Sequence, residues 1–280
     1  MAVSRTAASH TAASRTAVSR TALGRTAVGG TGARPTAARH LGLTARAAVA
    51  TRAGPDGATR VTVLRSDGSL ALRSTPGGVY LIGAAAGPVG GDDLSLEIDV
   101  GPGSRLVLRS AAASVLLPGP HQDASRLRTR ARVAAGGRLD YCLHPAVAAA
   151  GCNHHATATV ELEPGGMLRW REAIVLGRHG EPAGQCVSRL DVSMAGLPLY
   201  RGELAVGSPG TDRSSAVLEG AGAVGSVLLA DAARAQPPPE VHDGLAILPL
   251  AGPGSAVSAM AADAALLASR LDRGEQIAGY

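Results

Sequence analysis

A short pattern that occurs three times constrains the fold of this chain more than any other feature. In each copy an apolar residue is followed three positions later by glycine and six positions later by leucine; the copies span residues 100–108, 133–141 and 162–170. A looser copy spans residues 63–72. Glycine tolerates the positive φ of a tight turn, so each copy predicts two short strands joined by a hairpin turn. A repeat of about thirty residues is typical of hairpin arrays and β-solenoids.

Alternation of apolar and polar residues predicts further strands around these repeats. Leu94, Leu96, Ile98 and Val100 alternate with polar residues, as on a strand with one buried face. Residues 126–133 alternate arginine with smaller or apolar residues, which predicts a strand with a basic face. We therefore expect a mostly β fold with a β-helical or hairpin-repeat architecture and a few helices.

One of these helices is predicted near the C-terminus. Ser255 is a suitable N-cap residue. The apolar residues that follow fall on one face of a helix, which we expect to pack on a sheet: Val257, Met260, Ala264, Leu267 and Leu271.

The distribution of charge divides the chain. Residues 1–55 hold eight arginines and no acidic residue, which leaves nineteen arginines against twenty-two acidic residues, a net charge of −3, in the remainder. Residues 56–280 therefore lack the net positive charge that is typical of nucleic-acid-binding domains. Residues 1–40 repeat Ser-Arg-Thr-Ala without apolar periodicity, so we expect them to be disordered and residues 41–280 to form a single β domain.

The cysteine content and the hydropathy limit the cellular compartments in which this protein is expected. Three cysteines are too few, and odd in number, for a secreted disulfide framework, which favours a reducing cytoplasm. No run of about 18 apolar residues is present, so no membrane span is expected.

One group of residues could bind a metal ion. Cys142 and His144 lie two residues apart on a predicted strand and therefore share a face, and Cys152 and His154 repeat that spacing, with His155 following. Thiolate and imidazole ligands suit zinc or nickel. The spacing is not that of a standard zinc site, so the alternative is that these side chains are structural.

Two loops carry polar residues whose roles we expect to be structural or in interaction. Gly90 and Gly91 precede Asp92 and Asp93, and a carboxylate there can accept backbone N–H bonds that hold the turn. Arg178 and Glu181 lie in a glycine-bounded turn around His179, where an ion pair can pin the loop. No nucleophile lies beside this turn, so an acid–base role is the weaker interpretation.

Four stretches resemble the urease accessory protein UreD family, called UreH in some organisms. They are residues 87–104, with Gly-Gly-Asp-Asp-Leu, and residues 108–115, 139–145 and 176–184. The resemblance covers about Ala58 to Leu204. It departs from the family at Ala111 and Val115, where the family has Gln and Lys, and at Leu143, where it has Pro.

The resemblance implies a non-enzymatic function. UreD proteins act with UreF and the GTPase UreG to deliver Ni²⁺ into apo-urease, and an internal tunnel is the proposed nickel path. This chain is then expected to be a scaffold and nickel conduit in a hetero-oligomer with UreF, UreG and urease apoprotein. The family fold is described as β-helical, and no tightly bound cofactor is expected, only Ni²⁺ in transit.

Two other functions remain open at this point. One is a metal-dependent hydrolase that uses the cysteine and histidine cluster. The other is a β-solenoid interaction module without a metal function. Metal bound stoichiometrically together with hydrolytic turnover would favour the hydrolase.

Overall fold

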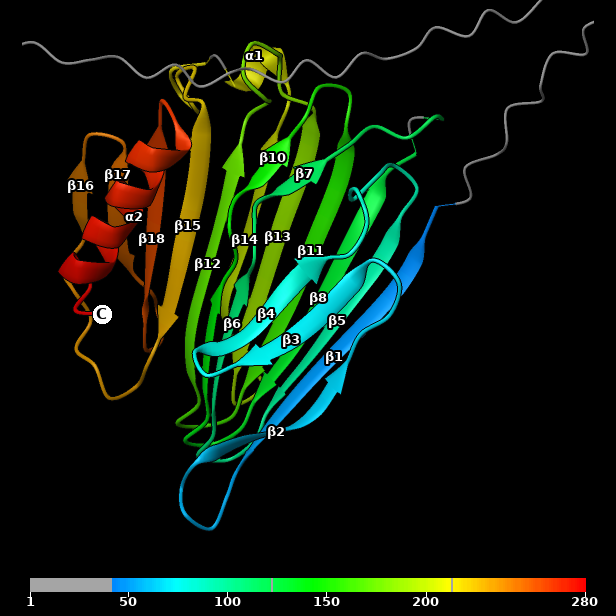
Figure 1. Cartoon of the computed structure of the whole chain (residues 1–280). Coiled ribbons are helices and arrows are strands. Elements are labelled where there is room, and N and C mark those ends of the chain that lie inside the picture. The colour runs from blue at the N-terminus through cyan, green and yellow to red at the C-terminus, as the bar shows by residue number, and fades with distance from the viewer. Residues whose placement is uncertain (1–41, 122, 213) are drawn as a thin grey trace, which may run out of the picture. The chain divides into compact units, whose positions relative to one another are not determined.

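The computed structural model describes residues 42–280 except 122 and 213 (Figure 1). The predictions for residues 1–40 lie outside the described residues. The strands are β1 (Thr44–Ala53), β2 (Thr59–Arg65), β3 (Leu70–Thr75), β4 (Gly78–Gly83), β5 (Asp93–Val100), β6 (Arg105–Ser110), β7 (Ser114–Leu116), β8 (Ser125–Val133), β9 (Arg138–Cys142), β10 (Ala146–Ala148), β11 (Asn153–Leu162), β12 (Met167–Val175), β13 (Gln185–Met194), β14 (Leu197–Val206), β15 (Ala223–Ala230), β16 (Glu240–His242), β17 (Leu245–Pro249) and β18 (Ser255–Ala261). The helices are α1 (Pro209–Asp212) and α2 (Ala264–Ile277).

The strands form two facing sheets. Sheet A has the order β14-β13-β11-β8-β5-β1-β2, and sheet B has the order β16-β17-β18-β15-β12-β9-β6-β4-β3, with β10 pairing β12 and β7. The chain passes from sheet A to sheet B and back, so that β5, β8, β11 and β13 are parallel neighbours in one sheet and β6, β9 and β12 in the other. The result is a β-solenoid of about four turns with 54% of residues in strands, which confirms the predicted mostly β, β-helical fold.

The three glycine-containing repeats form stacked corners of the solenoid. Gly103, Gly136 and Gly165 all have positive φ, between 62° and 79°. The Gly103 and Gly136 amides donate to Ala135 and Gly165 carbonyls of the next turn, at 3.2 Å each. Each corner joins a strand of sheet A to a strand of sheet B, so these copies are not hairpins, because a hairpin would return to the same sheet.

The looser fourth copy does not join this stack. Its Gly68 has φ of 55°, but a Cβ there would lie 3.2 Å from the Ala45 side chain at the start of β1. Because β2 runs antiparallel to β1, Gly68 lies near the start of β1, at the opposite end of the strands from the stacked corners.

The C-terminal helix is present but begins later than the sequence predicts. Residues Ser255–Ala261 form strand β18, and Asp263, not Ser255, caps α2 through a 2.8 Å bond from the Leu266 amide. This segment forms a strand because Val257 and Ala259 lie on one face with a period of two, and because the segment pairs with both β15 and β17. The predicted helix is therefore wrong for Val257 to Asp263, about two turns, and correct from Ala264.

The main core fills the space between the sheets. Corresponding residues of successive turns lie in register, such as Leu106, Leu139 and Leu168, which are all buried. The Tyr141 ring stacks on Trp170 with centroids 3.7 Å apart. Repetition of the same apolar positions therefore produces one continuous core without phenylalanine.

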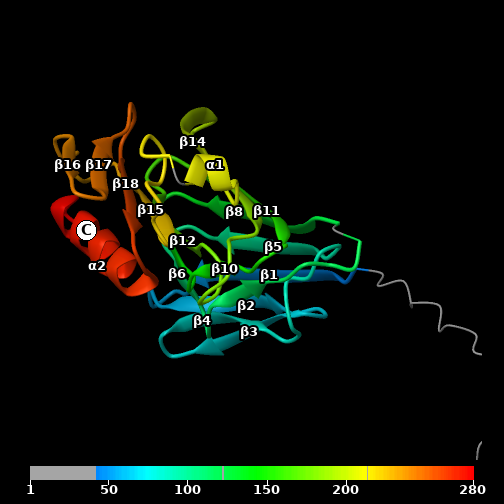
Figure 2. The same cartoon turned by 90° about the horizontal axis from the view of Figure 1, so that it is seen from above.

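Helix α2 covers the outer face of sheet B and is fixed there by a charge network (Figure 2). Arg169 donates to Asp140 at 2.8 Å and to both carboxylate oxygens of Glu275 on α2. Arg171 also reaches Glu275, at 3.2 Å. All of these side chains are nearly excluded from solvent.

We expect Arg169→Met to lower the free energy of unfolding by about 3 kcal/mol, because it leaves two buried carboxylates without their shared cation. Chemical denaturation measures the change. Arg189→Met is the control, since Arg189 makes an exposed ion pair with Asp191 on sheet A and its loss should change stability little. Equal effects of the two substitutions would contradict the importance of the network.

Candidate functional site: a polar pocket inside the solenoid

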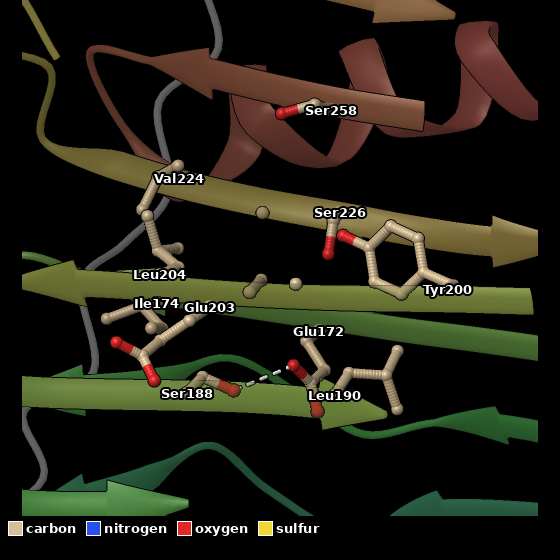
Figure 3. A pocket seen from close by; sticks show the side chains of 13 residues that line it. Glu172, Ile174, Ser188, Leu190, Tyr200, Glu203, Leu204, Val224, Ser226 and Ser258 are labelled. Carbon is tan, nitrogen blue, oxygen red and sulfur yellow. Dashed lines mark hydrogen bonds between the residues drawn. The ribbon is translucent and has the colours of Figure 1, made fainter. Parts of the chain in front are cut away.

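A pocket of about 200 Å³ opens between the ends of the two sheets. Its inward-facing polar side chains come from strands that are distant in sequence: Glu172, Ser188, Tyr200, Ser226 and Ser258, with the exposed Glu203 at its rim. Figure 3 shows these side chains projecting from β12, β13, β14, β15 and β18. The pocket therefore exists only because the solenoid brings its last turns together.

Glu172 is the carboxylate at the inner end of this pocket. It continues the inward-facing row of Leu168 and Trp170 on β12, so a charged residue stands at an apolar position. The Trp170 indole N–H donates to it at 2.7 Å, and the Ser188 hydroxyl donates at 2.8 Å. Burial raises the pKa of Glu172, and these two bonds partly offset that rise because they favour the carboxylate.

Two tyrosines lie within reach of the charge of this carboxylate. Burial and the charge of Glu172 raise the pKa of Tyr200 and that of Tyr141. Both phenols therefore stay protonated at neutral pH and can donate hydrogen bonds. The site is a set of oxygen ligands and donors within an apolar interior.

The polar interior continues along sheet A from this pocket. Cys186 lies two residues before Ser188 and is in register with His154, whose Nδ1 is 2.8 Å from the Ser125 hydroxyl. Burial lowers the pKa of His154 to about 4, so the imidazole is neutral at physiological pH. Neutral imidazole is the form that binds metal ions.

The structure separates the five cysteine and histidine residues of the predicted cluster. Cys142 and His144 line a pocket of about 260 Å³ beneath α2, on the outer side of sheet B. Cys152 and His154 are buried, and His155 is exposed on sheet A. Within the described ranges, no group of three or more His, Cys, Asp or Glu residues is arranged to hold a metal ion.

Cys152 instead neighbours Cys186, in a small apolar cluster with Leu116 and Ile174. Burial raises the pKa of Cys152 to about 11 and that of Cys186 to about 12, so both are thiols at neutral pH. Spacing along the chain groups Cys152 with Cys142, because it does not show which strands lie side by side. Cys186 comes close through the parallel pairing of β11 with β13.

The glycine-rich loop is held by Asp92. Its two carboxylate oxygens accept the Leu43 amide at 2.8 Å and the Val89 amide at 2.9 Å. Asp92 is buried, whereas Asp93 makes a partly exposed ion pair with Arg128. Gly90 is required for close packing, since a Cβ there would lie 2.5 Å from the Gly119 amide nitrogen.

The Arg178 turn is pinned in the way that its residues suggest. Glu181 accepts from the Arg178 side chain at 2.7 and 2.9 Å and from its backbone amide at 2.9 Å. It also accepts from the Ala150 amide at 3.2 Å. The Arg178 bonds are the main reason that the pKa of Glu181 falls to about 2.

Sequence reasoning missed Glu172, Ser188 and Tyr200 as a site. One signal was present, because Glu172 interrupts an alternating row of Leu168, Trp170 and Ile174 on a predicted strand. A carboxylate in a core-facing row is rarely tolerated without a partner. Its partner and the pocket, however, come from strands whose arrangement the sequence did not determine.

Comparison with known proteins identifies the family. Residues 43–275 match the family model described as UreD urease accessory protein. This chain belongs to the UreD family. It is 43% identical over 270 residues to the urease accessory protein UreD of Frankia alni, covering 81% of this chain and 90% of that protein. It is 41% identical over 245 residues to UreD 3 of Streptomyces griseus, covering 82% and 95%.

Membership of the UreD family supports a role in urease maturation alongside other maturation factors. The resemblance found in the sequence is thereby confirmed. Among the residues described, no helix is long and apolar enough to cross a membrane.

We expect Asp92→Ala to lower the free energy of unfolding by about 2 kcal/mol, because two partly buried backbone N–H groups lose their acceptor. The matched control is Asp93→Ala, which removes only a surface ion pair and should cost less than about 1 kcal/mol. Urea denaturation of both variants makes the comparison. A larger loss from the Asp93 change would show that the loop is held differently.

The raised pKa of Glu172 also predicts a pH effect. A carboxyl whose pKa is higher in the folded state binds a proton more readily there than in the unfolded chain. Its contribution to stability therefore declines as the pH rises from the unfolded-state pKa to the folded-state pKa. Glu172→Gln removes this titration. We therefore expect the variant to gain stability relative to wild type as the pH rises above the ordinary range of a glutamate carboxyl, as measured by denaturant unfolding at each pH. A difference independent of pH would contradict the assignment.

Proposed function

We propose that this UreD protein is a scaffold and nickel conduit that acts with UreF, UreG and urease apoprotein in the cytoplasm. The observation that carries the proposal is the polar pocket around Glu172 inside an otherwise apolar solenoid. A buried carboxylate lowers the stability of the fold, because burial favours its neutral form. Buried groups with shifted pKa values are therefore found more often at functional sites than elsewhere. Passage of a divalent cation is a function that a buried carboxylate can serve.

The donor set of the pocket suits transient binding. Glu172 offers one carboxylate with the Ser188 hydroxyl beside it, and the Tyr200 hydroxyl points into the pocket toward Ser226 (Figure 3). A hard set of few ligands binds nickel less tightly than a closed set of thiolates and imidazoles. Weak binding permits fast release, which a conduit requires.

A scaffold role is supported by what the chain lacks as well. The sequence has no P-loop, so GTP hydrolysis in this process must come from a partner such as UreG. Three free thiols agree with a reducing compartment. The hydrolase alternative has no gathered set of metal ligands within the described residues to support it.

Urease activation tests the conduit directly. In a strain that expresses a urease operon lacking its own UreD, we expect Glu172→Gln to reduce urease activity several-fold at limiting nickel, while UreF and apo-urease still co-purify with the variant. Glu97→Gln is the control, because Glu97 is an exposed carboxylate on the outer face of sheet A. Wild-type activation by the Glu172 variant at limiting nickel would remove the pocket from the path. Loss of co-purification would indicate a scaffold defect instead.

The cysteine and histidine ligands are tested separately. Cys142 and His144 line one pocket, so replacing both with Ala removes the only two of the five predicted ligands that share it. If they take part in nickel transit, calorimetric nickel binding and urease activation should both fall. Since the chain is expected to pass nickel on, wild-type binding itself should be weak. Unchanged behaviour in both assays would leave these residues a structural role.

A further inference from the structure

Among the residues that the structure describes, no strand pairs with the outer edge of β14. Strand β14 contains ten residues and pairs with β13 on one side only, as the last strand of sheet A. The other edge strands have seven residues (β2), six (β3) and three (β16), and β2 is interrupted by a register shift opposite Ala50 and Thr51. The one irregularity lies near Pro198, so Tyr200 to Val206 presents an uninterrupted edge. Pro198 and the register shift beside it protect only the start of β14, and Tyr200 to Val206 has no proline, bulge or inward-facing charge, although Arg201 and Glu203 are exposed charges on it.

Sheet B extends beyond this edge with one face uncovered. Ser226, Ser258, Ala246 and Val241 lie in one register row across β15, β18, β17 and β16. Helix α2 packs on the opposite face of these strands, through residues such as Val257 (Figure 2). On the uncovered face Val241 is 76% exposed and Leu248 is 46% exposed. The facing layer that sheet A supplies elsewhere stops at β14.

We propose that a β-strand from a partner protein adds antiparallel to β14 and covers this face. An added strand lies about 4.8 Å from its neighbour, and stacked sheets lie about 10 Å apart. A strand in that position both completes the β14 ladder and supplies the layer opposite β18. A helix could cover the apolar face but could not satisfy the free backbone groups of β14.

Charge on β14 specifies the sequence of that strand. Arg201 and Glu203 project on the outer face of sheet A, where Arg201 faces Asp191 and Glu203 faces Arg189 across the β13 pairing. Directly opposite residues of an antiparallel pair share a face, and like charges there are destabilising. The partner strand therefore carries an acidic residue opposite Arg201 and a basic residue opposite Glu203. Its other face is apolar, toward Leu204 and Tyr200.

A second copy of this chain would also place opposite charges across from each other, but the two copies would collide. Pairing two β14 strands about Gly202 would set Arg201 opposite Glu203 of the other copy. The two-fold axis of such a pair is perpendicular to the sheet, so it leaves both B sheets on the same side. Each copy would then bring its own β16–β18 extension into the space that the other copy needs. A single partner strand meets no such competition.

The added strand would also lie beside the Glu172 pocket. Gly202 and Glu203 of β14 line that pocket together with Ser258 of β18. The proposal rests on the edge and the uncovered face, and it does not depend on nickel transport.

Two synthetic peptides and one double variant test the proposal. The matched peptide, Val-Thr-Val-Lys-Ala-Glu-Val, places Lys opposite Glu203 and Glu opposite Arg201 when it runs antiparallel to β14; the control peptide exchanges its Lys and Glu. Binding of fluorescent forms to the full chain is measured by anisotropy. We expect the matched peptide to bind about tenfold tighter, since two attractive pairs replace two repulsive ones.

The double variant Arg201→Glu with Glu203→Arg should reverse this preference. Its thermal unfolding is compared with that of wild type, so that misfolding is not mistaken for lost binding. If neither peptide binds the folded wild-type chain, or if the preference does not reverse in the folded variant, the proposal is overturned. A variant that does not fold is replaced by Glu203→Gln, which should weaken only the matched peptide. A wild-type dimer in sedimentation that Glu203→Arg abolishes would assign the edge to a second copy and would also overturn the proposal.

Discussion

The in-register stacking of three glycine corners is the constraint on which the rest of the structure depends. Gly103, Gly136 and Gly165 allow the chain to leave one sheet and enter the other at the same level in each turn. Once the corners are stacked, every strand that follows begins in register with the strand of the previous turn. Because side chains alternate along a strand, this register also decides which residues face the core and which face outward. A change in length at one corner would reverse both faces of the next strand.

The same register explains how a polar site arises inside an apolar core. Most inward positions repeat as Val, Leu or Ala, so a deviation at one position of one strand is surrounded by the apolar rows of its neighbours. Glu172 is such a deviation, and it is accommodated by Trp170 on its own strand and Ser188 across the interior. These partners keep a carboxylate in a place where burial works against its charge. The pocket is therefore a local departure from the repeat, at the end of the solenoid where the sheets diverge.

The two sheets end differently, and this difference separates a covered surface from an uncovered one. On sheet B, α2 is fixed by Arg169 between Asp140 and Glu275, with the Tyr280 ring beneath the Arg138 and Arg234 guanidinium groups. On sheet A, β14 ends the sheet with an unpaired edge. Because this charge network has little solvent exposure, it holds α2 stably against sheet B. The edge of β14 is where we propose that a partner strand binds.

The sequence by itself determined the repeat, the mostly β solenoid, the helix from Ala264 and the family, because these depend on local periodicity and on glycine at turns. It also indicated the loop bonds of Asp92 and the Arg178–Glu181 pair, whose partners are close in the chain or are backbone groups. It did not determine that Ser255 begins a strand, since only pairing with β15 and β17 makes period two prevail over period 3.6. Nor could it separate Cys142 from Cys152 or bring Glu172 to Ser188 and Tyr200. Those relations depend on which sheet and which face each strand occupies, and only the tertiary structure decides that.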